Sequence, residues 1–127
     1  LRRAIAQRYA SDGLAVDPQE IIITTGAMEA LSLSLQVLTE PGDWVVVESP
    51  TFYGALQAIE RLQLKVVEIP VIPGVGIDLA LLTEALILRP IKACWLMGNV
   101  QHPLGHTMPD GHKQGLMALL NAHEVPL

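Results

Sequence analysis

The chain has 127 residues, 50% of them hydrophobic, and a formal net charge of −5. Its 8 lysines and arginines are scattered, so we expect no basic surface for nucleic acid, and no apolar stretch is long enough to cross a membrane. A single cysteine excludes an internal disulfide and fits a reducing, cytoplasmic location. The length suits one domain or part of one.

Helical and strand patterns alternate along the chain. The first pattern is a helix over 1–10, which Ser11-Asp12-Gly13 ends because glycine can adopt the left-handed conformation of a helix C-terminus. The β-branched run Ile21-Ile22-Ile23-Thr24 then predicts a short strand. A helix over 28–38 is expected next, followed by a turn at Glu40-Pro41-Gly42-Asp43.

The same order of strand and helix continues to the end of the chain. Further strands are predicted over 44–48, 65–69 and 91–97, and further helices over 51–62, 78–88 and 109–121. Thr51 and Asp78 are expected to be the N-caps of the first two of these helices. Pro70 is expected to close a strand and 73–76 to form a loop, while Cys94 is expected to be a buried hydrophobe.

This order, a helix followed by strand–helix units, predicts an α/β fold. Because the strands alternate with helices of about three turns, we expect a mainly parallel sheet. The near-continuous apolar strands indicate a sheet covered on both faces, which gives a three-layer α/β/α arrangement. No repeat, low-complexity segment or linker divides residues 1–127.

The loops that follow the predicted strands carry the candidate binding residues, because ligands of open α/β sheets bind at the carboxyl ends of strands. The first loop is Thr24-Thr25-Gly26-Ala27-Met28. Gly26 allows a close backbone approach, and the helix start offers unpaired N–H groups that favour an anion such as phosphate. The loop matches neither a Walker A motif nor a dinucleotide fingerprint, and a plain turn is the alternative.

The second loop is Glu48-Ser49-Pro50-Thr51-Phe52-Tyr53-Gly54. It contains the only phenylalanine of the chain, Phe52, next to Tyr53. An aromatic side chain at a strand exit can stack on a flat ligand ring. The alternative is a core aromatic at the start of a helix.

The third loop runs from Asn99 to Gly105 and includes Gln101-His102-Pro103-Leu104-Gly105. Its proline and glycine impose a sharp exit from the strand. The amides of Asn99 and Gln101 can donate to a ligand oxygen, whereas a polar connecting loop is the alternative.

Metal binding is not predicted. His102 and His106 are separated by Pro103 and Gly105, which oppose the helical pairing of a His-x-x-x-His site, and no acidic residue or cysteine clusters nearby. The acidic residues of the chain are scattered and are expected to lie on solvated helix faces.

The order and spacing of several short motifs carry a resemblance that covers nearly the whole chain. These motifs are Leu1-Arg2-Arg3-Ala4-Ile5-Ala6, the segment 22–31, Pro41-Gly42-Asp43, the segment 48–54 and the segment 101–105. The series resembles class I/II aminotransferases of the type I pyridoxal-phosphate fold. It is most similar to the branch in which such a domain is fused to a winged-helix DNA-binding domain, the MocR-type regulators of the GntR family.

The resemblance implies pyridoxal phosphate as cofactor and assigns roles to five residues of the chain. Gly26, Ala27 and Met28 would present backbone N–H groups to the cofactor phosphate, and Phe52 would stack on the pyridine ring. Residue 102 would meet the 3-hydroxyl of the ring, where the enzymes have asparagine and this chain has His102. An imidazole still donates a hydrogen bond, but it is bulkier and can titrate.

The chain begins with Leu1 inside a helical pattern and ends at Val125-Pro126-Leu127, which resembles the start of another strand. We therefore expect a piece of a larger protein, part of its cofactor-binding large domain. The family's Schiff-base lysine is expected outside it, because none of the three lysines, Lys65, Lys92 and Lys113, matches the family's lysine motif. The fragment alone is therefore expected to be inactive. Because the family places its first strand beside strands that come later in sequence, the segment 21–24 is expected to lack its native neighbour.

Two kinds of full-length protein are compatible with the resemblance: an aminotransferase, or a transcriptional regulator that senses a ligand. Either would take an amino acid or amine as substrate or effector and would form a homodimer, and DNA would be bound only by a separate N-terminal domain. A non-catalytic interaction domain that keeps the fold without working cofactor chemistry is the alternative, which His102 favours. A generic α/β domain with chance motifs is the third interpretation.

Overall fold

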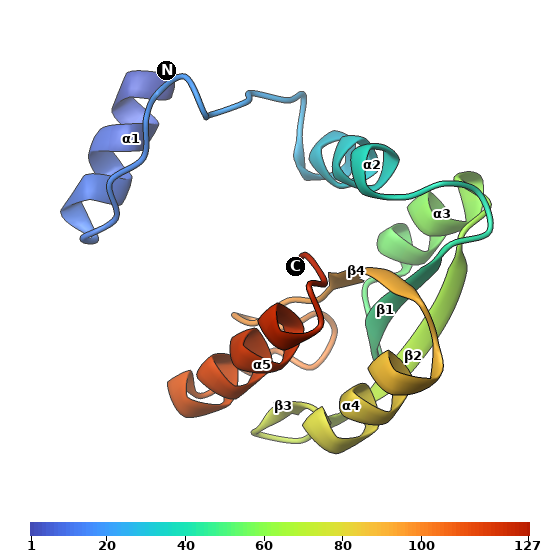
Figure 1. Ribbon diagram of the computed structural model, residues 1–127. Coiled ribbons are helices and arrows are strands. Elements are labelled where there is room, and N and C mark those ends of the chain that lie inside the picture. The colour runs from blue at the N-terminus through green and yellow to red at the C-terminus, as the bar shows by residue number, and fades with distance from the viewer. The chain divides into compact units, whose positions relative to one another are not determined.

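The computed structural model describes all of residues 1–127, which form two compact units, Leu1–Ala30 and Leu31–Leu127. Figure 1 shows the helices and strands along the chain. The first unit holds helix α1 (Arg2–Ser11) and the start of helix α2 (Ala27–Leu38), and the second unit holds the rest of α2 and all of the strands. None of the helices has both the length and the apolar character needed to span a bilayer.

In the first unit, α1 confirms the first predicted helix, and it ends beside the glycine that the sequence supplies. Gly13 has a φ of +84°, and its N–H donates to the Ala10 carbonyl at 3.1 Å. The left-handed conformation at this position is one that glycine adopts without steric cost.

The strand predicted at 21–24 is wrong, because this segment has no regular secondary structure. None of its backbone N–H and C=O groups has a hydrogen-bond partner within the chain, and Ile22 is 81% exposed. β-branched residues form a strand only where a neighbouring strand completes their hydrogen bonds. No strand of these 127 residues pairs with this segment.

The second unit is built on a 4-stranded sheet in the order β3-β2-β1-β4. Its strands are β1 (Trp44–Ser49), β2 (Lys65–Ile72), β3 (Gly76–Ile77) and β4 (Ile91–Trp95). β1 pairs in parallel with both β2 and β4, whereas β3 pairs antiparallel with β2. The predicted α/β fold with a mainly parallel sheet is confirmed.

The end of β2 differs from the prediction. The strand continues through Pro70 to Ile72, and the predicted loop at 73–76 is the turn that leads into β3. Pro70 has no N–H to leave unpaired, and its carbonyl accepts a hydrogen bond from the N–H of Asp78 at 2.9 Å. A proline within a strand is tolerated where no ladder donor is required of it.

The end of β4 also differs, since the strand stops at Trp95 rather than Met97. The N–H of Met97 donates to the Glu48 side chain instead of a neighbouring strand. Residues 125–127 form no strand, although the Pro126 carbonyl accepts a hydrogen bond from the N–H of Cys94 at 2.9 Å.

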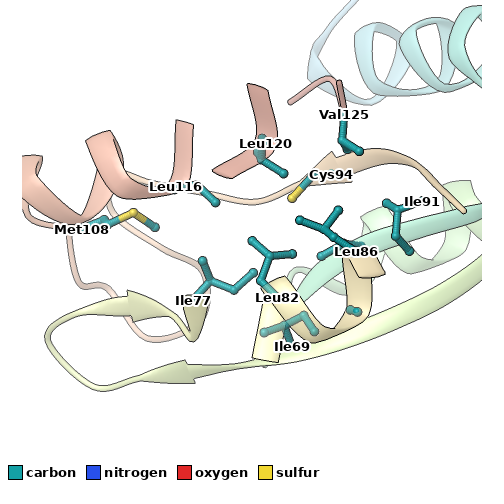
Figure 2. Close-up of a cluster of buried hydrophobic side chains, with 12 residues drawn as sticks. Ile69, Ile77, Leu82, Leu86, Ile91, Cys94, Met108, Leu116, Leu120 and Val125 are labelled. Carbon is teal, nitrogen blue, oxygen red and sulfur yellow. The ribbon is translucent and has the colours of Figure 1, made fainter. Parts of the chain in front are cut away.

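Helices cover both faces of the sheet and complete the three predicted layers. α4 (Leu79–Leu88) and α5 (Asp110–Ala122) pack on one face, around the apolar cluster drawn in Figure 2. The buried residues of this cluster are Val46, Ile69, Ile77, Leu82, Ala85, Leu86, Ile91, Cys94, Met108, Leu116, Leu120 and Val125. α3 (Tyr53–Arg61) and residues 31–38 of α2 cover the other face, around Leu35, Val45, Val47, Ile59, Leu64 and Ala93.

Cys94 lies within the first of these clusters and is 3% exposed. Burial raises the pKa of its thiol to about 12, and the nearby Glu48 carboxyl adds to the effect. A thiol that stays protonated at physiological pH is a poor nucleophile. The prediction that Cys94 is a buried hydrophobe is confirmed.

Helix α4 begins at the predicted N-cap. The Oδ1 atom of Asp78 accepts hydrogen bonds from the N–H groups of Ala80 and Leu81 at 2.9 and 3.1 Å. The cap satisfies donors that have no partner inside the helix.

Replacing Asp78 with alanine is expected to destabilise α4 by about 1 kcal/mol, because both donors lose their acceptor. Hydrogen exchange of the α4 amides measures the change in opening free energy. Asp78→Asn keeps a side-chain acceptor and should exchange much like the wild type. Unchanged exchange in Asp78→Ala would contradict the role of the cap.

Candidate functional site

The loops that follow β1 and β4 lie at one edge of the sheet, because these two strands are parallel neighbours. Residues 50–52 connect β1 to α3, and residues 96–109 connect β4 to α5. These loops are the second and third candidate segments of the sequence. The structure brings them together, and their contacts are direct.

An aromatic pair marks the meeting point of the two loops. The ring centroids of Phe52 and His102 are 5.4 Å apart, and their planes cross at 82° in an edge-to-face contact. The Tyr53 ring lies 5.0 Å from that of Phe52. Phe52 is half-buried and belongs to neither apolar cluster, which argues against a simple core role.

Gly54 leaves the space that the Phe52 ring occupies. A Cβ atom at position 54 would lie 2.5 Å from Cε1 and 2.6 Å from Cζ of Phe52. Because no real Cβ approaches another carbon so closely, any other residue at position 54 would displace the ring. The placement of Phe52 therefore depends on glycine at this position.

Gln101 is 1% exposed although it lies in a loop. Its Nε2 donates to the Pro50 carbonyl at 2.7 Å, and its Oε1 accepts from the N–H of Leu104 at 2.9 Å. Its backbone N–H donates to the His106 carbonyl at 2.8 Å. The sequence predicts that the Gln101 side-chain amide donates to a ligand, but in the structure it forms its hydrogen bonds with backbone groups of the two loops.

Glu48 is the second buried polar residue of this region, at 1% exposure. Its Oε1 accepts the N–H of Met97 at 2.9 Å, and its Oε2 has no hydrogen-bond partner. Burial raises the pKa of this carboxyl, while the Met97 N–H, the Gln101 amide and His106 act in the opposite direction. The net result is a carboxyl that takes up a proton more readily than an exposed glutamate.

The expectation that all acidic residues are solvated is wrong for Glu48. Side chains alternate along a strand, so Glu48 points to the same face of β1 as Val46, which lies in the cluster with α4 and α5. The sequence held a usable signal, because Glu48 continues the run Trp44-Val45-Val46-Val47 of a strand covered on both faces.

Thr51 does not cap α3 as predicted. The N-cap is Phe52, and no side chain completes the cap. The Oγ1 atom of Thr51 is buried without a hydrogen-bond partner. Buried hydroxyls almost always have hydrogen-bond partners, so this atom is an exception within these residues.

The other polar residues of the third loop point to no metal centre. The Asn99 side chain accepts a hydrogen bond from Nζ of Lys113, in α5, at 2.9 Å. His102 is exposed and His106 is half-buried, and no group of three or more histidine, cysteine or acidic side chains is arranged to hold a metal ion.

The glycine loop at the start of α2 belongs to the first unit. Gly26 has a φ of +140°, a conformation that side-chain-bearing residues rarely adopt. The Glu29 carboxylate accepts hydrogen bonds from the N–H and the hydroxyl of Thr25. No side chain or carbonyl of the chain accepts from the N–H groups of residues 26–28, so this helix start keeps free donors of the kind that bind phosphate.

Comparisons with known proteins show the family of the chain. The family model described as "Aminotransferase class I and II" matches residues 1–127. The chain is 58% identical to YdcR of Escherichia coli, an uncharacterized HTH-type transcriptional regulator, over 100% of this chain and 27% of YdcR. It is 40% identical to a second uncharacterized HTH-type regulator of Escherichia coli, YjiR, over 98% of this chain and 27% of YjiR.

The fold also matches solved structures. LysN, an alpha-aminoadipate aminotransferase from Thermus thermophilus that was crystallised with N-(5′-phosphopyridoxyl)-L-leucine, superposes with a TM-score of 0.84 and 27% sequence identity. The match covers 94% of this chain and 31% of LysN. The chain thus spans about 27% of the length of the curated relatives it matches.

Proposed function

The chain belongs to the aminotransferase class I and II family, and on this premise we propose that its protein binds pyridoxal phosphate and acts as a transcriptional regulator that senses an amino acid or amine. The observation that carries cofactor binding is the Phe52–His102 pair at the carboxyl edge of the parallel sheet. This is where ligands bind in open α/β sheets, and an aromatic face there suits a flat heteroaromatic ring.

The residues of the chain fit such a cofactor. Phe52 is half-buried with its ring in the space that Gly54 leaves, and the buried hydroxyl of the neighbouring Thr51 has no hydrogen-bond partner within the chain. We propose that Phe52 stacks on the pyridine ring and that His102 donates a hydrogen bond to the ring hydroxyl. Within the first unit, we propose that the free N–H groups of Gly26, Ala27 and Met28 bind a phosphate group. Pyridoxal phosphate, when bound, supplies an electron-withdrawing ring that activates amino compounds.

The regulator is favoured over the enzyme by the relatives. The chain is 58% and 40% identical to two HTH-type regulators but 27% identical to the aminotransferase LysN. With a net charge of −5, DNA binding would fall to residues other than these 127, and the protein would act as a homodimer. An aminotransferase is the second candidate, supported by the match to LysN over 94% of this chain.

Titration of the full-length gene product with pyridoxal phosphate is expected to give a saturable visible circular-dichroism signal. Pyridoxal, which lacks the phosphate, should bind roughly tenfold more weakly, because the donors of residues 26–28 have nothing to bind. Gly26→Ala should weaken pyridoxal phosphate but leave pyridoxal unchanged, since alanine disfavours a φ of +140°.

The matched control is Gly74→Ala, which places alanine at a φ of +75° in the turn between β2 and β3. It should change neither affinity. No saturable signal with the wild type would overturn cofactor binding and favour an interaction domain that only keeps the fold. Addition of amino acids separates the remaining candidates, because a regulator changes its DNA affinity whereas an aminotransferase produces oxo acid over many turnovers.

A further inference from the structure

The two loops at the carboxyl edge of the sheet are joined chiefly by one buried side chain. Gln101 donates to the Pro50 carbonyl of the loop after β1 at 2.7 Å and accepts from Leu104 within its own loop at 2.9 Å. Both polar atoms of the amide are therefore engaged, one toward each loop. An amide buried to 1% exposure is held firmly in such an arrangement, because loss of either partner leaves a buried polar atom unpaired.

The joined loops are those that carry the aromatic pair. Pro50 precedes Phe52 by one intervening residue, and His102 directly follows Gln101. The two rings meet edge to face at 5.4 Å, although each comes from a different loop. A contact between two loop side chains is reproducible only where the backbones that carry them are fixed relative to each other.

The base of the second loop is fixed in a similar way. Glu48, at the end of β1, accepts the N–H of Met97 just after β4 at 2.9 Å. The backbone N–H of Gln101 donates to the His106 carbonyl at 2.8 Å, so the loop also closes on itself. The side chain of Gln101 then makes the one direct hydrogen bond between residues 99–106 and residues 50–52.

We propose that Gln101 is a positioning residue, whose buried side chain fastens the loop after β4 to the loop after β1 and thereby holds Phe52 against His102. Only the consequence for pyridoxal phosphate rests on the proposed function. The attachment of one loop to the other consists of hydrogen bonds within the chain, and it can be measured without any cofactor.

The test uses Gln101→Met in the full-length gene product, because methionine keeps the length of glutamine and removes both polar atoms. Hydrogen exchange of the peptide that covers residues 99–106 is expected to become roughly tenfold faster at the Leu104 amide, which loses its acceptor. The dissociation constant for pyridoxal phosphate is expected to rise roughly tenfold, as the ring pair loses its fixed geometry. Gln101→Asn, which is one methylene too short to reach both partners, should change both quantities in the same direction and provides the test if Gln101→Met does not fold.

The matched control is His112→Leu. His112 in α5 also spans two elements through one hydrogen bond, from Nε2 to the Ile77 carbonyl of β3 at 2.8 Å, but it lies outside both loops. Its loss should lower the urea midpoint without changing exchange at residues 99–106 or the affinity for pyridoxal phosphate. A merely structural role for Gln101 would make the two variants behave alike.

Unchanged hydrogen exchange at the Leu104 amide in Gln101→Met would show that the Gln101 side chain does not fasten the two loops together. Faster exchange with an unchanged affinity, in a wild type that binds pyridoxal phosphate, would overturn the positioning role. If the wild type binds no pyridoxal phosphate, the proposed function fails, and the exchange of residues 99–106 still decides whether Gln101 fastens the two loops.

Discussion

The free energy of unfolding of Glu48→Gln, measured relative to that of the wild type, is expected to increase as the pH rises above 4.5. The folded structure raises the pKa of this carboxyl, chiefly because it is buried. The stability that the protonated carboxyl supports is fully present below the unfolded pKa of about 4.5 and is lost as the pH rises through the folded pKa. Glutamine does not titrate and keeps an acceptor for the Met97 N–H, so the variant escapes this loss.

The difference in free energy of unfolding between variant and wild type should increase by about 1.4 kcal/mol for each pH unit between the unfolded and the folded pKa of Glu48. Above the folded pKa it should stay constant. Hydrogen exchange of the β1 amides at pH 5 and pH 8, compared between the two proteins at each pH, measures it. Glu84→Gln, which removes a carboxylate from an exposed position of α4, controls for the change in net charge. A difference that does not depend on pH would show that folding does not raise the pKa of Glu48.

The central part of the fold could be predicted from the sequence because local and long-range signals agree there. Val45, Val46 and Val47 are each 0% exposed, so the apolar run that predicts a strand is also the run that the sheet buries on both faces. Asp78 combines a capping side chain with a helical pattern after it, and the structure shows both.

The predictions failed where the outcome depends on residues distant in sequence. The segment 21–24 has strand composition, but a strand also needs a neighbour, and none of these 127 residues supplies one. Pro70 is a residue that usually ends a strand, yet the hairpin with β3 carries the strand past it. Local propensity contains no information on such partners.

The candidate site was predictable as a place but not in its internal bonding. The position of loops after strands identified Phe52 and His102 as neighbours of one edge, and the structure places their rings in contact. The hydrogen bonds of Gln101 could not be read from the sequence, because they depend on how two loops 51 residues apart meet. Polar side chains in loops are usually solvated, so the general rule predicts the opposite of what the structure shows.

Replacing Phe52 with leucine is expected to weaken the binding of both pyridoxal phosphate and pyridoxal by roughly tenfold or more, since stacking on an aromatic side chain contributes about 1–3 kcal/mol. Leucine keeps an apolar side chain but offers no flat face to the pyridine ring. Phe52→Tyr retains the ring and should bind both compounds nearly as well as the wild type. Circular-dichroism titration of the full-length gene product measures all of these affinities.

Tyr53→Leu is the control for Phe52→Leu, because Tyr53 is the adjacent aromatic residue and is 66% exposed. It should leave both affinities unchanged, and an equal effect of the two variants would remove the special role of Phe52. The comparison of the two compounds assigns the residue to the ring. Substitution of a phosphate-binding residue should weaken pyridoxal phosphate but not pyridoxal, as expected for Gly26. Substitution of a ring-stacking residue should weaken both compounds equally. If Phe52→Leu weakened only the phosphorylated compound, Phe52 would act on the phosphate or on the fold of its loop and not on the pyridine ring.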